Sequence, residues 1–108
     1  MTRLKYNIVN TRKGIHLIEE VGKVGIKILI FLARRGKAKL TEFRTRMGAG
    51  YEGIYSALYK LRELGLIEEK REGNTRFFKL TEEGKKIADL LEQADRYLIK
   101  LIESRGPV

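Results

Sequence analysis

Apolar side chains recur at helical spacing over residues 87–102, and this is the clearest pattern in the chain. Repeats of three and four positions place such side chains on one face of an α-helix. Thr81, followed by two glutamates, marks a helix start, because a hydroxyl caps free N–H groups and acids favour the positive end of the helix dipole. A Gly-Pro pair at 106–107 marks the end. The pattern predicts a helix of about 22 residues, roughly 33 Å long.

Two shorter runs precede this helix, at 66–72 and 75–80, and a Gly-Asn pair separates them. A two-residue link of this kind between alternating runs predicts a β-hairpin. On the second strand Phe78 and Leu80 share one face, which we expect to be buried.

Three helices are predicted in the middle of the chain. Residues 25–35 form a strongly apolar segment closed by a glycine, and Thr41 is expected to cap a short helix that ends at Gly48. Residues 50–64 form the third helix, which a glycine again ends. We expect its buried stripe to contain Ile54, Ala57, Leu58, Leu61 and Leu64.

The first twenty residues are compatible with two structures. Apolar residues alternate over 4–8 and 15–17 around a loop-like segment, which suits a hairpin. The set Leu17, Ile18 and Val21 suits a helix nearly as well. We expect extended structure up to about Ile18.

The charge balance is the first indication of function. The 108 residues hold 23 Lys and Arg against 14 Asp and Glu, which gives a net charge of +9 and a pI near 9.9. Ten of the bases and only two of the acids lie in the first forty residues. A charge excess can simply solvate a surface, but one of this size on a small domain favours binding to nucleic acid.

Composition excludes several classes of protein. The chain has no cysteine, which rules out disulfides, thiolate catalysis and cysteine-ligated zinc. Its one histidine, His16, has no catalytic partner at a suggestive spacing and is expected to be a surface or half-buried residue, and carboxylates do not cluster at ligand spacing. We therefore expect no metal, no cofactor and no enzymatic activity.

The longest apolar run, 28–33, is far shorter than the ~20 residues of a membrane span, and no signal-peptide stretch begins the chain. We expect a cytoplasmic, nucleoid-associated protein with no membrane partner. Abundant Lys, Arg and Glu with a single Gln lean towards a thermophilic source, such as an archaeon.

The predicted elements follow the order helix, short helix, tight turn, helix, hairpin, long helix. Two segments carry a resemblance, YSALYKLRELGLI at 55–67 and REGNTRFFKLTEEG at 71–84. Across about residues 25–103 the chain resembles the winged helix-turn-helix domains of the PadR and MarR families of transcriptional regulators. The resemblance implies an α+β, mainly α fold with a two-stranded wing, a recognition helix at 50–64 and sequence-specific binding of duplex DNA.

Three regions are expected on this interpretation. Residues 1–20 form a basic arm or hairpin, residues 21–80 the winged helix-turn-helix core, and residues 81–108 a dimerisation helix.

The recognition helix has an open face once Leu58 is taken as the centre of its buried stripe and each residue turns by about 100°. That face is polar and includes Glu63. It also carries tyrosines, whose apolar rings are unfavourable in contact with water alone. Free N–H groups at the helix start can bind a phosphate, and polar side chains read base edges in the major groove. Tyr51 has an alternative, which is to pack on Phe43. The expected DNA contacts are Gly50, Tyr51, Glu52, Tyr55, Ser56, Tyr59 and Lys60.

Two further segments are expected to contact DNA. In winged-helix proteins the wing holds the flanking backbone or minor groove, and the resemblance gives that role to Lys70, Arg71, Asn74, Thr75 and Arg76. The N-terminal segment carries four bases and no acid, and it forms either a minor-groove arm or an extra strand that stabilises a dimer. Its bases are Arg3, Lys5, Arg12 and Lys13.

Residues 48–53 also match the G-x-G-x-x-G fingerprint of dinucleotide-binding proteins. That fingerprint must follow a strand inside a βαβ unit, whereas here it follows a helix. We therefore interpret Gly48 and Gly50 as turn residues, and Gly53 as a position where two helices approach.

The last helix predicts a homodimer. Its apolar residues advance by four and three, which is heptad spacing, and a small core covers only the first turns, near Ile87 and Leu90. A second copy of the chain is the expected cover for the remainder. Alternatively the helix folds back along the apolar segment 26–32, and both arrangements can hold together. The expected dimer residues are Leu91, Ala94, Leu98, Leu101 and Ile102.

Three functions remain open at this point. The leading one is a dimeric transcriptional regulator that binds a pseudo-palindromic site in duplex DNA. The second is an architectural or plasmid-partition protein of the same fold with little sequence preference. The third is a winged helix that binds only proteins. The sequence gives no indication of a small-molecule effector.

Overall fold

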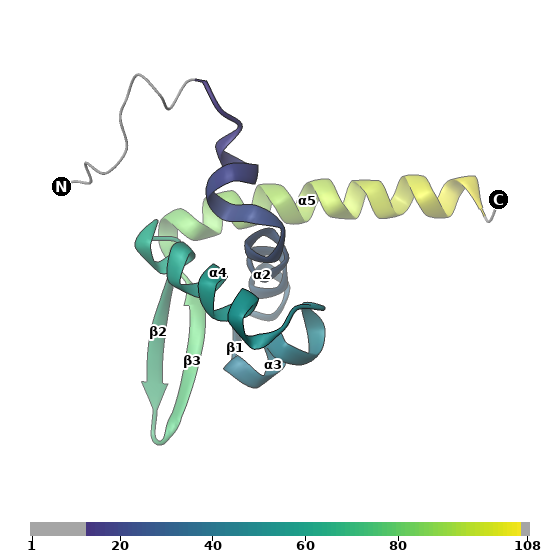
Figure 1. Ribbon diagram of the computed structural model, residues 1–108. Coiled ribbons are helices and arrows are strands. Elements are labelled where there is room, and N and C mark those ends of the chain that lie inside the picture. The colour runs from purple at the N-terminus through teal and green to yellow at the C-terminus, as the bar shows by residue number, and fades with distance from the viewer. Residues whose placement is uncertain (1–12, 107–108) are drawn as a thin grey trace.

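The computed structural model describes residues 13–106. A β-hairpin at residues 67–80 extends from one edge of a group of helices, and a long final helix projects to one side (Figure 1). The elements in chain order are η1 (Leu17–Val21), α2 (Gly22–Arg35), β1 (Lys37–Ala38), α3 (Leu40–Arg46), α4 (Tyr51–Glu63), β2 (Ile67–Glu72), β3 (Thr75–Leu80) and α5 (Glu82–Arg105). The order confirms the expected α+β, mainly α winged helix-turn-helix, in which α3 and α4 form the helix-turn-helix and β2 and β3 the wing.

The sheet has three antiparallel strands in the order β1-β3-β2, one more than expected. β2 and β3 pair from Ile67 with Leu80 to Glu72 with Thr75. The third strand, β1, is only two residues long and pairs Ala38 with Phe78. A strand of two residues carries too little alternation to be read from a sequence.

The core lies where α2, α3 and α4 meet the inner face of the sheet. Phe43 of α3 is fully buried, and its ring lies 5.9 Å from the rings of both Phe31 and Phe78. The expected stripe of α4 is buried at four of its positions and half-buried at Leu64. The turn between α3 and α4 uses Gly48 at a φ of 67°, a left-handed conformation that favours glycine. The helix-turn-helix therefore follows the predicted pattern closely.

The start of α3 differs from the expectation. Thr41 was expected to cap this helix, but it is the second residue inside it, and Lys39 holds the N-cap position. Here the backbone N–H of Lys39 donates to a carboxylate oxygen of Glu42 over 2.8 Å. A glutamate that reaches back to its own helix start supplies the cap that the hydroxyl was expected to give.

The expected extended structure near Ile18 is also wrong. Residues 17–21 form a single turn of π-helix that runs into α2. The N–H groups of Ile18 and Glu19 both donate to the carbonyl of Ile15, over 3.1 and 3.0 Å. The backbone of this segment thus bonds to itself rather than to a strand. The expected alternation at 4–8 lies outside the described residues.

α5 begins as predicted and is anchored tightly at that end. Its N-cap is Thr81, whose hydroxyl oxygen accepts from the Gly84 N–H over 3.0 Å and donates to the Gly65 carbonyl over 2.6 Å. Gly84 packs so closely on the backbone of Leu66 that an added Cβ would lie 1.8 Å from its carbonyl oxygen. A glycine is therefore required in the Leu-Thr-Glu-Glu-Gly segment.

Of the two α5 residues expected to contact the core, Ile87 is half-buried against it and Leu90 is not. Leu90 is 66 % exposed, whereas Ala88 is fully buried. Residues two apart on a helix point in nearly opposite directions, so Leu90 faces away from the side on which Ile87, Ala88 and Leu91 meet the core. α5 runs along α2 at its start and then projects beyond the domain, and the expected folding back onto α2 holds for this first part (Figure 1). None of the helices in the described part of the chain is long and apolar enough to cross a membrane.

Candidate nucleic-acid interface

The open face of α4 is where the sequence places it. Glu52, Tyr55, Ser56, Tyr59 and Glu63 are all exposed, and Lys60 is half-buried. The opposite face holds Ile54 and Leu61 in the core. Packing of α4 against α2 and the sheet therefore fixes the orientation of the polar face.

Three tyrosines run along this face and form what we call the tyrosine ridge: Tyr51, Tyr55 and Tyr59. They are 43, 51 and 65 % exposed. The rings of Tyr51 and Tyr55 stack at 5.5 Å, and Tyr51 does not pack on Phe43 because its other neighbour is Arg44, whose guanidinium lies 4.0 Å from the ring centre. The ridge is thus a partly ordered aromatic surface rather than a set of independent side chains.

Arg44 was not among the residues that the sequence predicted to contact DNA. Besides stacking on Tyr51, its Nη1 donates to the Tyr51 hydroxyl oxygen over 3.1 Å. Lys27 of α2 was missed too, and its Nζ donates to the Met47 carbonyl over 3.0 Å, beside the turn. An available signal was the position of Arg44 in the first helix of a helix-turn-helix, since that helix crosses the DNA backbone. Arg44 and Lys27 therefore lie beside the start of α4, where Gly50 is the N-cap and no side chain caps the free N–H groups. Arg46 of α3 is also exposed, but it lines a pocket with Lys27, Arg34 and Asp95.

Lys60 is less available than expected. Its Nζ lies 3.3 Å from a carboxylate oxygen of Glu20 in η1. Tyr59 is also engaged, because its hydroxyl donates to Glu63 over 3.0 Å. Lys60 therefore belongs as much to the contact between η1 and α4 as to the open face.

The wing divides into paired and unpaired cations. Arg76 forms an ion pair with Glu69, which Arg62 of α4 also contacts at 3.3 Å. Lys70 and Arg71 are exposed and make no ion pair within the described part of the chain. The other expected wing contacts, Asn74 and Thr75, are exposed and half-buried at the hairpin turn.

Of the expected N-terminal DNA contacts, only Lys13 lies within the described residues. Lys13 is exposed just before η1. Arg3, Lys5 and Arg12 lie outside the described residues, as does the choice between arm and strand.

The glycine motif at 48–53 acts in the turn, as expected for Gly48, but one interpretation is wrong. Gly53 was expected to allow two helices to approach, yet an added Cβ there would meet only the Ala49 side chain, at an ordinary 3.6 Å. The close approach that needs a glycine is instead at Gly84, where α5 meets the end of the helix-turn-helix.

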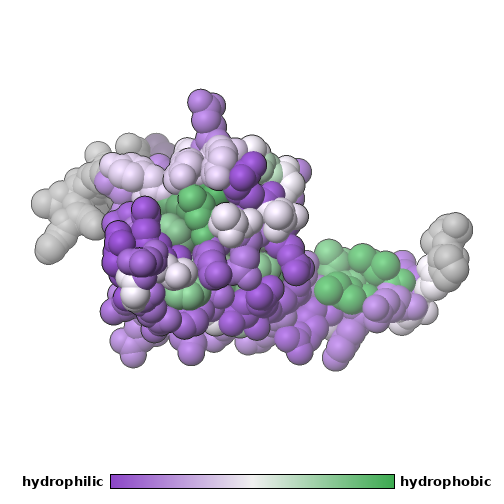
Figure 2. All heavy atoms as spheres, turned by 90° about the horizontal axis from the view of Figure 1, so that it is seen from below, coloured by the Kyte–Doolittle hydropathy of each residue, from purple (hydrophilic) through white to green (hydrophobic). Residues whose placement is uncertain are grey.

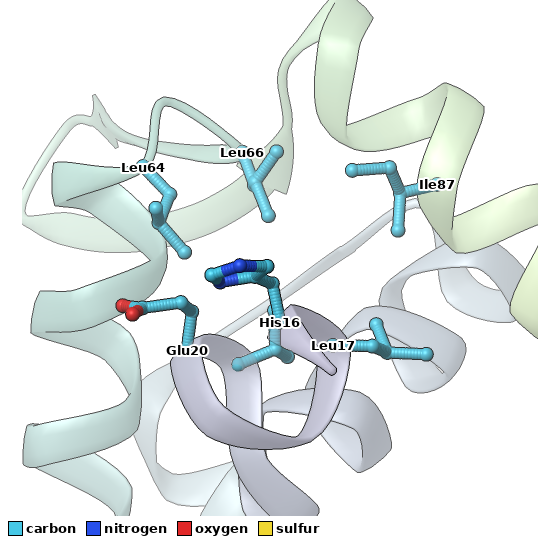
Figure 3. A pocket seen from close by; sticks show the side chains of 7 residues that line it. His16, Leu17, Glu20, Leu64, Leu66 and Ile87 are labelled. Atoms are coloured by element: carbon cyan, nitrogen blue, oxygen red, sulfur yellow. The ribbon is translucent and has the colours of Figure 1, made fainter. Parts of the chain in front are cut away.

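His16 lines an apolar cavity of about 500 Å³ between η1, the end of α4 and the start of α5 (Figure 3). Its Nε2 is buried and has no hydrogen-bond partner within the described part of the chain. The half-buried position matches the expectation for this residue. Around the imidazole lie Leu17, Glu20, Val21, Leu64, Leu66 and Ile87. No group of three or more potential metal ligands occurs among the described residues.

The projecting part of α5 is apolar and uncovered. Leu98 is 53 % and Ile102 59 % exposed, and together with Leu90, Tyr97 and Leu101 they form what we call the α5 stripe. Figure 2 shows this patch at the projecting end, beside a largely hydrophilic domain. Of the other expected dimer residues, Ala94 is exposed, whereas Leu91 is half-buried against the core.

An ion-pair cluster fastens the first half of α5 to α2. Arg34 contacts Glu92 at 3.0 Å and Asp95 at 2.7 Å, and Arg96 contacts the same oxygen of Glu92 at 2.9 Å. The hydrogen bonds from Arg96 and Arg34 lower the pKa of Glu92 below its ordinary value, and those from Glu92 and Asp95 raise the pKa of Arg34. Glu92 is therefore charged although it is only 9 % exposed.

Comparison with known proteins places this geometry in a family. The family model for EarA-like proteins matches residues 20–91, from η1 to the first half of α5. The chain belongs to the EarA-like family. An archaeal relative, the uncharacterized protein MJ0905 of Methanocaldococcus jannaschii, is 39 % identical over 51 residues, which cover 47 % of this chain and 46 % of that protein. This EarA-like chain thus spans about half the length of its curated relative.

Solved structures share the fold of the EarA-like chain at low identity. ZitR of Lactococcus lactis has a TM-score of 0.72 and 16 % identity, and the match covers 98 % of this chain and 66 % of ZitR. The transcriptional repressor BigR of Xylella fastidiosa has a TM-score of 0.67 and 22 % identity, covering 80 and 86 %. HlyU of Vibrio cholerae has a TM-score of 0.62 and 23 % identity, covering 82 and 97 %. At these identities the likeness shows the fold alone, and the finer resemblance to PadR and MarR stays a prediction.

Proposed function

We propose that the chain regulates transcription by binding duplex DNA as a symmetric dimer, with α4 in the major groove and the wing on the flanking backbone. The observation that carries this proposal is the exposed face of α4, an aromatic and polar surface held in place by the core and bordered by cations. Arg44 of α3 stacks on Tyr51 at the start of this face, and the wing carries the exposed Lys70 and Arg71. If α4 served only to fill the core, its exposed face would not need aromatic side chains.

The surroundings of α4 suit a phosphate backbone. Lys27 and Arg44 lie next to the start of the helix, where free N–H groups and the positive end of the dipole also attract anions. In helix-turn-helix proteins the first helix crosses the backbone while the second enters the groove. The cations on α3 are therefore placed to hold the register of α4.

A dimer accounts for the α5 stripe. Burying Leu98, Leu101 and Ile102 would contribute roughly 1.5–3 kcal/mol for each side chain, and a two-fold partner supplies the same surface in return. Two recognition helices related by the two-fold axis would enter successive major grooves about 34 Å apart, so the site should be a pseudo-palindrome.

The proposal is tested by the salt dependence of binding. For six to ten neutralised phosphates the affinity should fall by about 10³ to 10⁵ between 50 and 200 mM salt, with a linear plot of log K against log salt. Fluorescence anisotropy with a labelled duplex measures this. A flat response, or no binding at all, would contradict the proposal and favour a protein-interaction module.

The contribution of the wing can be tested separately. Replacing Arg71 by alanine should weaken binding and reduce the slope by about two units, because each protomer of the dimer loses one phosphate contact. Lys86→Ala is the matched control, since Lys86 is exposed on α5, away from the wing and α4. Equal slopes for the two variants would remove the wing from the interface.

A regulator is distinguished from an architectural protein by its specificity. A site enriched from random duplexes should bind at least ~10³ times more tightly than unrelated DNA. A ratio near one would support the architectural or partition role instead.

A further inference from the structure

We propose that the tyrosine ridge of α4 recognises the 5-methyl groups of thymine in the major groove. This inference rests on the proposed function, because it assigns a base preference to the same helix. Thymine is the one base that presents a methyl group there, and apolar side chains recognise it.

The ridge has the dimensions of a short run of base pairs. Its three tyrosines are four residues apart, so each step rises about 6 Å and turns by about 40° around the helix. The ridge therefore extends over about 12 Å, and base pairs follow one another at about 3.4 Å. A helix lying along the groove would set the rings against three or four base pairs.

The hydroxyl groups at both ends of the ridge are already bonded, and the Tyr51 ring also contacts Arg44, so the most exposed rings are those of Tyr55 and Tyr59. The Tyr51 hydroxyl accepts a hydrogen bond from Arg44, and the Tyr59 hydroxyl donates one to Glu63. Tyr55 lies between them with its ring stacked on Tyr51 at an interplanar angle of 18°. The ordered part of the surface is thus aromatic carbon.

The side chains that recognise other bases are scarce on this face. The helix contains no Asn or Gln, the residues that bind adenine in a bidentate manner. Its two cations are directed elsewhere, Lys60 to Glu20 and Arg62 to Glu69, although guanine is read by Arg or Lys. Apolar contact with thymine is the base-specific chemistry that remains, beside the ability of Glu52 to accept from cytosine.

The acids on the same face exclude the backbone as the partner of the ridge. Glu52 and Glu63 flank the tyrosines and would repel phosphates. Phosphates would instead meet the cations of α3, where Arg44 contacts Tyr51. Base edges are therefore the part of DNA that the ridge can approach.

The experiment compares thymine with uracil, which pairs identically and lacks only the methyl group. Sites are first enriched from random duplexes, and the selected site is then synthesised with uracil at one thymine position at a time. One or two positions in each half-site should lose about fourfold in affinity, the effect of one buried methyl group, and the others should not change.

Variants of Tyr55 then assign the effect to the ring. Tyr55→Ser should bind the thymine and uracil duplexes equally, while Tyr55→Phe should keep the fourfold difference because the ring remains. Both changes lie at an exposed position, so the melting temperature should stay within a few degrees of the unchanged chain. Loss of the difference in Tyr55→Phe would mean that the hydroxyl reads the base, and it would overturn the inference.

The remaining outcomes separate this inference from the proposed function. Tight binding to a selected site with equal affinity for every uracil duplex overturns the inference alone. Binding without any enriched sequence also overturns it, because base reading requires a preference. Absence of DNA binding overturns both.

Discussion

The two halves of α5 carry similar apolar side chains but lie in different surroundings. The first half packs on α2, with Ala88 fully buried, Gly84 against the backbone of Leu66 and Glu92 in an ion-pair cluster. The second half carries Leu98 and Ile102 into solvent. The first half packs through small residues, an ion-pair cluster and the half-buried Ile87 and Leu91, whereas the large aliphatic residues of the second half are exposed.

This difference shows that the pattern of a helix does not tell how far along its length the domain covers it. At 100° per residue Leu98 and Ile102 lie within about 20° of Leu91, on the side of α5 that meets the core in the first half, while Leu90 and Tyr97 point well away from that side. The same side of α5 therefore meets the core in its first half and solvent in its second. The following changes test the two halves against each other.

The largest effect is expected at the projecting end. Replacing Leu98 and Leu101 together by glutamate should give a folded monomer, because like charges would face each other across the proposed two-fold axis. Loss of the second half-site should weaken DNA binding by about 10² to 10⁴-fold. Analytical ultracentrifugation and anisotropy measure the two effects.

The matched control makes the same change in net charge on the opposite side of the helix. Lys85→Glu changes one exposed residue and should leave the dimer intact. If the unchanged chain sediments as a monomer at tens of micromolar, the proposed role of the α5 stripe is wrong.

Next in size is a comparison of two alanines. Ala88→Leu should destabilise the fold by about 1–3 kcal/mol, because extra carbon atoms are forced into a filled contact with the core. Ala94→Leu places the same side chain at an exposed position and should leave the free energy of unfolding almost unchanged. Urea denaturation gives both values, and equal losses would mean that the two halves are covered alike.

A smaller effect is expected from the two hydroxyls near the ends of α5. Thr81→Ala removes the N-cap and its bond to the Gly65 carbonyl, and should cost about 1 kcal/mol. Ser104→Ala removes only a bond to the carbonyl one turn back, on the projecting half, and should have no measurable cost. Thermal melting compares the two variants. An equal loss of stability in Ser104→Ala would show that the projecting half of α5 also contributes to the stability of the domain.

The smallest effect concerns the pH dependence of the first half. Because the folded pKa of Glu92 is lowered, its ion pairs stabilise the fold above the pKa of the unfolded chain, about 4.3, and this contribution is lost as pH falls through the folded pKa. Glu92→Gln should be less stable than the unchanged chain at pH 7, and the gap should narrow towards pH 3. A gap independent of pH would show that the charge on Glu92 contributes nothing.

Much of the fold was accessible from the sequence because local signals agreed with each other. The Gly-Asn link, the glycine at 48 and the Thr81 cap each fixed a boundary to within a residue or two. The failures came where the deciding contact is distant in sequence. The two-residue strand β1 exists only through pairing with β3, and the buried side of α5 is determined by α2 and Leu66.

In the candidate interface, too, local features were predictable and contacts between distant elements were not. Periodicity identified the open face of α4, since burial follows from spacing along one helix. The partners of its side chains were not accessible, because Lys60 is paired with Glu20 of η1 and Tyr51 with Arg44 of α3. Contacts between elements depend on packing angles that no local pattern encodes.

The junction at Gly84 has a mechanical consequence for a dimer. α5 is a rigid rod about 36 Å long, so a tilt of only 5° at its origin would displace the far end by about 3 Å. Close backbone contact with Leu66 and the Thr81 bond to Gly65 lock that origin directly onto the exit from α4. In a dimer held at the far ends, this joint acts as the pivot of two lever arms, and its stiffness determines how much variation in half-site spacing the pair of recognition helices can tolerate.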